Sequence, residues 1–86
     1  MSLPNYYYIA VKGSLHATDC QVFGLNEDER DALSKRYSNS SAEVIMNGVI
    51  IKGAAMDVIN SLSELGYHVV CSTGEAEIVW TMQREI

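Results

Sequence analysis

Strand-like segments outnumber helical ones in this 86-residue chain, and that ratio limits the folds open to it. The strand-like segments are rich in β-branched and aromatic residues and are bounded by polar or glycine-containing stretches. They cover residues 6–12, 20–25, 42–46, 49–52, 67–72 and 77–83, whereas 26–36 and 54–65 have helical patterns. The order strand-strand-helix-strand-strand-helix-strand-strand predicts one small α+β domain over residues 1–86. We expect a six-stranded, mainly antiparallel sheet with two helices.

The first predicted helix is marked at both of its ends. Asn26 is a favourable N-cap, and Glu29 three residues later completes a capping-box-like pattern. Acidic residues follow the cap, while Lys35 and Arg36 lie near the predicted end, so the charges match the helix dipole. These signals predict a helix that begins after Asn26 and ends near Arg36.

The second predicted helix has an apolar stripe. Met56, Ile59, Leu62 and Leu65 recur at spacings of three, and Val58 widens the same stripe. We expect these side chains to pack against the sheet.

Glycines mark the ends of the remaining elements. Gly66 follows the second helix and is a natural C′ residue. Asn47-Gly48 stands between two β-branched runs and predicts a type I′ hairpin turn, in which both residues take a positive φ. Thr73-Gly74 predicts the turn between the last two strands.

The apolar content exceeds what this fold can hide beneath two helices. Hydrophobic residues make up 48% of the chain, and residues 49–51 and 78–80 are apolar without alternation. In the first strand Tyr6, Tyr8 and Ala10 face one side, while Tyr7, Ile9 and Val11 face the other. Two helices can cover one face of such a sheet, so the second face needs another chain as a cover. The alternative is a rolled sheet that buries both faces within one chain.

Charge and composition exclude several classes of partner. The net charge is -5, and the six basic residues are scattered, which argues against nucleic acid and anionic membranes. No apolar run reaches the roughly 20 residues of a transmembrane helix, and no signal peptide is evident. Cys20 and Cys71 are too few for a small secreted domain. We therefore expect a cytoplasmic protein with two reduced thiols.

The sequence offers little for catalysis. His16 and His68 are far apart, and neither has a second ligand at metal spacing, so we expect no metal and no cofactor. The acidic run at 27–31 is explained by the start of a helix. One enzyme alternative remains: if Met1-Ser2-Leu3 is an added leader, Pro4 could supply the N-terminal amine of a small tautomerase.

The final turn is the strongest candidate for a ligand. Glu75 and Glu77 flank it, next to Gly74. Backbone N–H groups there could bind a carboxylate while an acidic side chain binds an ammonium group, a pairing that suits a free amino acid. The competing interpretation is an ordinary hairpin turn with solvated acids.

The last third of the chain resembles the GTP cyclohydrolase I feedback regulatory protein family. The matching positions are Leu62, Leu65-Gly66-Tyr67, Val69, Thr73-Gly74 and Val79-Trp80, and Pro4 with Tyr6 is similar to the family's Pro-Tyr start. The segment after Gly74 departs from the family, because it is one residue shorter and carries Glu75 and Glu77 where a glutamine is typical.

The resemblance implies a non-catalytic regulator. Members of the family are α+β proteins that form pentameric rings and dock on GTP cyclohydrolase I. The complex conveys feedback inhibition by tetrahydrobiopterin and stimulation by phenylalanine. The turn at Gly74, Glu75, Ala76 and Glu77 is then expected to face an effector or the partner, and Tyr8, Ile9 and Ala10 to lie on an interface strand. The alternative is an amino-acid sensor or interaction module with another partner.

Overall fold

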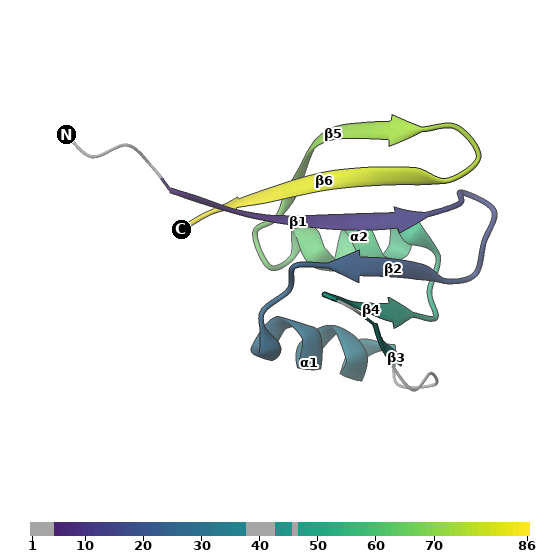
Figure 1. Ribbon diagram of the computed structural model, residues 1–86. Coiled ribbons are helices and arrows are strands. Elements are labelled where there is room, and N and C mark those ends of the chain that lie inside the picture. Colours follow the sequence, from purple (N-terminus) through teal and green to yellow (C-terminus); the bar gives the residue numbers. More distant parts are fainter. Residues whose placement is uncertain (1–4, 38–42, 46) are drawn as a thin grey trace.

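The computed structural model describes residues 5–37, 43–45 and 47–86, which form one antiparallel sheet and two helices (Figure 1). The elements are β1 (Tyr6–Gly13), β2 (Cys20–Phe23), α1 (Glu27–Arg36), β3 (Glu43–Ile45), β4 (Gly48–Ile51), α2 (Ala55–Ser63), β5 (His68–Gly74) and β6 (Ile78–Glu85). The predicted α+β class, the two helices and the antiparallel sheet are confirmed.

The strands lie in the order β3-β4-β2-β1-β6-β5, and every neighbouring pair is antiparallel. Five strands of four to eight residues form the body of the sheet. The short β3 adds three residues at one edge, so the predicted number of six depends on this segment alone. The first and last strands are neighbours at the centre and pair from Tyr6 opposite Glu85 to Gly13 opposite Ile78.

Helix α1 has the predicted boundaries but contributes little to the core. The Asn26 side chain accepts a hydrogen bond from the backbone N–H of Glu29 at 2.8 Å, which confirms the N-cap. The helix ends at Arg36, as predicted. Only Leu33 among its ten residues is buried, so apolar packing holds α1 at a single point.

Helix α2 packs through a stripe that differs from the predicted one. Its buried residues are Ala55, Val58, Ile59 and Leu62, the spacing of one helical face. Met56 and Leu65, which the sequence placed in the stripe, are 43% and 38% exposed. A strict spacing of three drifts around a helix of 3.6 residues per turn, so its first and last members leave the buried face.

Gly66 closes the turn after α2, which ends at Ser63 rather than at the predicted Leu65. It has a φ of +96°, and the backbone N–H of Gly66 donates to Ser63 O while that of Tyr67 donates to Leu62 O. This pair of bonds is the Schellman motif, in which the C′ residue takes the left-handed conformation that glycine adopts without strain.

The turn between β3 and β4 is not the predicted type I′ turn. Asn47 has the expected positive φ of 61°, but Gly48 does not and instead begins β4, paired with Ile45. A Cβ on Gly48 would lie 2.7 Å from the Phe23 ring and 2.8 Å from Val22 O. Glycine is therefore required here for close contact between strands rather than for the turn.

The core lies on one face of the sheet only. Its strand residues are Ile9, Val11, Cys20, Val22, Val49, Ile51, Trp80 and Met82, and both helices add their buried residues to the same cluster. Tyr6 and Tyr8 point away from it and are 40% and 55% exposed. The alternative of a rolled sheet that buries both faces is therefore wrong.

Polar contacts hold the start of α1. Tyr67 Oη donates to Glu29 Oε1 at 2.7 Å, and Arg84 Nη2 lies 3.2 Å from Glu29 Oε2. The Arg84 guanidinium also lies 5.0 Å from the centre of the Tyr67 ring and 5.5 Å from that of Tyr7. Burial raises the pKa of Tyr67 to about 12, although Arg84 favours the ionised form.

The observed buried face of α2 predicts that two Leu→Ala substitutions lower the free energy of unfolding by different amounts. Leu62→Ala removes a fully buried side chain and should lower the free energy of unfolding by about 2–5 kcal/mol. Leu65→Ala removes a side chain that is 38% exposed and should cost less than about 1 kcal/mol. Urea unfolding of the two variants measures the difference, and equal costs would contradict the assigned face.

The raised pKa of Tyr67 predicts a loss of stability in alkali. A tyrosine in the unfolded chain ionises near its ordinary pKa of 10.0, whereas Tyr67 in the folded chain keeps its proton up to about pH 12. The contribution of this raised pKa to the free energy of unfolding is therefore complete below pH 10 and is lost as the pH rises toward 12. Tyr67→Phe should have a shallower fall in unfolding free energy across that range. Identical slopes in the two proteins would rule out this contribution.

Candidate functional site

The side of the sheet that points away from the helices is the first candidate surface. We call it the open face. The register aligns its side chains in the rows Thr73–Val79–Lys12–Gln21–Ile50, Cys71–Thr81–Ala10–Phe23–Gly48 and His68–Gln83–Tyr8, with Tyr6 opposite Glu85. Both helices lie on the other side (Figure 1). The open face thus has Tyr6 and Tyr8 toward one end of β1 and a mixture of apolar and polar side chains over the remaining rows.

The predicted interface residues of β1 divide between the two faces. Tyr8 and Ala10 lie on the open face, and Tyr8 is 55% exposed. Ile9 lies in the core and is only 3% exposed. The prediction for Ile9 is wrong because alternate residues of a strand point to opposite faces, so three consecutive residues cannot share one interface.

The β5–β6 hairpin forms the second candidate surface. Gly74 ends β5 and pairs with Ile78, so the loop consists of Glu75, Ala76 and Glu77 and not of Thr73-Gly74. Gly74 has a φ of +118°, and a Cβ there would lie 2.1 Å from Glu77 O. The tight hairpin therefore requires glycine at this position, and its whole tip is exposed.

A small pocket lies beside this hairpin, and we call it the hairpin pocket. Its volume is about 160 Å³, and its walls come from the end of β1, the β1–β2 loop, β2, β4 and the hairpin tip. The lining residues are Lys12, Gly13, Ser14, Ala17, Asp19, Cys20, Gln21, Ile50 and Glu77. Of the predicted turn residues only Glu77 lines it, whereas Gly74, Glu75 and Ala76 do not.

The hairpin pocket offers both signs of charge to a ligand. Lys12 Nζ lies 3.0 Å from Glu77 Oε1, and both side chains are well exposed. An exposed ion pair contributes little to stability, so it can open at low cost. Lys12 could then bind a carboxylate while Asp19 or Glu77 binds an ammonium group. No local sequence pattern marks Lys12 and Asp19 as site residues, because only the β1–β2 and β1–β6 pairings bring them close to Glu77.

Metal-binding groups do not gather in the described part of the chain. Within residues 5–37, 43–45 and 47–86, no three His, Cys, Asp or Glu side chains lie close enough to hold a metal ion. His68 contacts Gln83 at 3.2 Å on the open face, and His16 is exposed in the β1–β2 loop. Pro4, on which the tautomerase alternative depends, lies outside the described residues.

Comparison of the chain with protein-family models, curated proteins and solved structures found no match. Neither helix in the described part of the chain is long and apolar enough to cross a membrane.

The two thiols should differ sharply in reactivity. Burial, with a further contribution from Asp19, raises the pKa of Cys20 to about 12, whereas Cys71 is exposed on the open face. The thiolate is the reactive form, so at pH 8 the folded protein should react with one equivalent of a maleimide, at Cys71. Mass spectrometry of the labelled protein checks this, with urea-unfolded protein as the control that reacts twice. Rapid labelling of Cys20 in the folded state would contradict its burial.

Proposed function

We propose that this protein is a non-catalytic regulatory protein that binds GTP cyclohydrolase I and conveys feedback inhibition by tetrahydrobiopterin and stimulation by phenylalanine. The observation that carries the binding role is the open face, which no helix covers and on which Tyr8 is 55% exposed. The identity of the partner comes from the resemblance of the last third of the chain, through Leu65-Gly66-Tyr67, Thr73-Gly74 and Val79-Trp80.

The open face suits a protein partner. Aromatic residues are the commonest anchors of protein interfaces because they bury a large area at a small cost in conformational entropy. Tyr6 and Tyr8 project from β1, and Phe23 lies diagonally across from Tyr8 on β2. Ile50 and Val79 lie further along the open face, in the row of Lys12. In the proposed cytoplasmic assembly, further copies of the chain and the cyclohydrolase cover this surface. The pentameric ring is part of the proposal and comes from the resemblance.

The hairpin pocket suits the effector. A free amino acid carries a carboxylate and an ammonium group, and the pocket holds Lys12 together with Asp19 and Glu77. An amino acid bound there would stabilise the complex if the partner completes the pocket. By linkage, the same free energy would then favour one state of the enzyme.

A second candidate function rests on the hairpin pocket alone. The paired charges would also serve an amino-acid sensor that has another partner. Binding of phenylalanine to the isolated protein, without association with a cyclohydrolase, would favour this second function.

Replacing Tyr8 tests whether the open face contacts GTP cyclohydrolase I. Tyr8→Glu places a charge beside the exposed Tyr6 on the open face and should weaken association with GTP cyclohydrolase I by roughly tenfold or more. The matched control is Met56→Glu, which introduces the same charge at a residue that is 43% exposed on α2 and should leave binding unchanged. Pull-down of the cyclohydrolase from the same organism, with and without phenylalanine, measures both variants.

Binding of the wild-type protein to the enzyme tests the proposed function itself. Capture of the enzyme, strengthened by phenylalanine, supports the regulatory function. Failure of the wild-type protein to bind the enzyme, with or without phenylalanine, would overturn it. An equal loss of binding in Tyr8→Glu and Met56→Glu would show that the open face is not the interface.

A further inference from the structure

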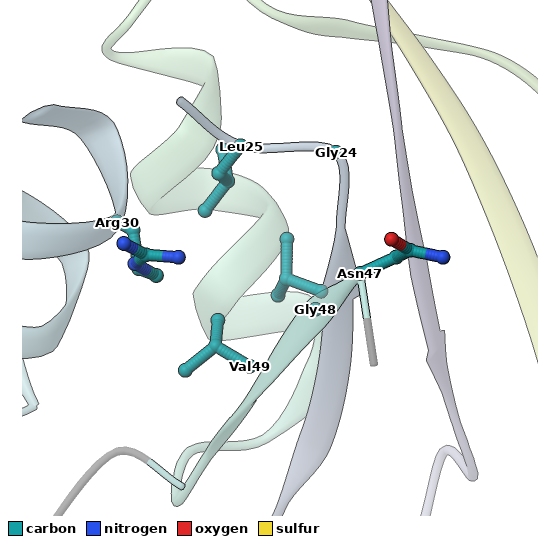
Figure 2. Close-up of a pocket in the computed structure, with 7 residues that line it drawn as sticks. Gly24, Leu25, Arg30, Asn47, Gly48 and Val49 are labelled. Carbon is teal, nitrogen blue, oxygen red and sulfur yellow. The ribbon is translucent and has the colours of Figure 1, made fainter. Parts of the chain in front are cut away.

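A larger cavity lies between α1 and the sheet, at the end of β2 away from the hairpin pocket (Figure 2). Its volume is about 350 Å³, and its lining residues are Val22, Gly24, Leu25, Arg30, Asn47, Gly48 and Val49. It shares no residue with the hairpin pocket. We call it the α1 cavity.

The way in which α1 is attached explains this cavity. The helix buries only Leu33, and its two ends are held by polar contacts. Glu29 binds Tyr67 and Arg84 near the first turn, while Arg36 forms a two-point ion pair with Glu64 at the last. Protein interiors are otherwise closely packed, and a cavity of this size is within the range that holds a small molecule.

The walls of the α1 cavity combine an apolar floor with one cation. Val22 and Val49 are buried, and Leu25 is half-buried. Figure 2 shows Arg30, Leu25 and Val49 projecting toward the same space, whereas the Asn47 side chain points away from it. Arg30 thus brings a guanidinium group to the rim of an apolar surface.

Arg30 differs from the other two arginines in having no acidic partner. Arg36 and Arg84 each form an ion pair with a glutamate, at 2.5 and 3.2 Å. No carboxylate in the described part of the chain lies within ion-pair distance of Arg30, although the chain carries a net charge of -5. Its five N–H donors are therefore free to bind an anion from outside.

We propose that the α1 cavity binds a small monocarboxylate with an apolar body, such as an aryl-alkyl carboxylate. The carboxylate pairs with the Arg30 guanidinium in the two-point geometry that arginine favours. The apolar body lies against Leu25, above Val22 and Val49, which are 0% and 1% exposed. The single cation matches a single negative charge. The net charge of -5 on the chain disfavours a more highly charged ligand such as phosphate.

The lining of the α1 cavity contains no acidic residue, so it favours a carboxylic acid without an ammonium group over a free amino acid. An ammonium group in the α1 cavity would lose water without gaining a carboxylate partner. The α1 cavity should therefore prefer a deaminated acid, while the hairpin pocket has the charges for a zwitterion. The inference does not depend on the proposed function, because it concerns the isolated chain and other residues.

An NMR titration of the full chain with 3-phenylpropionate tests the proposal. We expect concentration-dependent shifts of the Val22, Leu25 and Val49 methyl signals. The neutral 3-phenylpropanamide, inorganic phosphate and phenylalanine should each cause much smaller shifts at these methyls. Arg30→Gln should weaken 3-phenylpropionate binding by roughly tenfold or more, because it removes a charged hydrogen-bond donor.

The matched control is Lys35→Gln, which removes the same charge from an exposed position on the same helix and should bind like the wild type. The proposal is overturned if millimolar 3-phenylpropionate leaves the three methyl signals unmoved. It is also overturned if Arg30→Gln binds as tightly as Lys35→Gln, or if phosphate or the neutral amide binds as well as the acid.

Discussion

The whole arrangement depends on the placement of both helices against one face of the sheet. In β1, β2, β4 and β6 the side chains alternate between the two faces, so the chain neighbours of the core residues lie on the open face. In β1 the inward residues are Ile9 and Val11, and the outward ones are Tyr6, Tyr8 and Ala10. The open face is therefore the direct consequence of a sheet with one layer of helices. Its aromatic and aliphatic side chains can leave water only against another molecule.

The two helices are held by different kinds of interaction. Helix α2 lies on the sheet through four buried apolar residues, whereas α1 buries only Leu33 and is held at its ends by Glu29 and Arg36. Apolar packing fills the space beneath α2. Ion pairs at the ends of α1 fix its position without filling the space between its first turn and the end of β2. The α1 cavity and its unpaired Arg30 follow from this difference.

Local signals predicted the elements of this fold well and its contacts less well. Asn26 and Gly66 were placed correctly because capping depends on a few neighbouring residues. Gly48 was assigned to a turn, although the constraint on it comes from Phe23 and Val22 on another strand. The stripe of α2 was misplaced at Met56 because local spacing does not reveal which face meets the sheet.

The sequence by itself determined the class of fold, the number of helices, the caps and the presence of more apolar surface than one layer of helices can cover. These properties depend on composition, periodicity and neighbours in the chain. Only the tertiary structure decided which residues meet. Lys12, Asp19 and Glu77 converge through the pairing of strands, and Arg30 faces Val22 and Val49 because α1 lies over β2 and β4. Such sites join residues that are distant along the chain, and no local pattern records their approach.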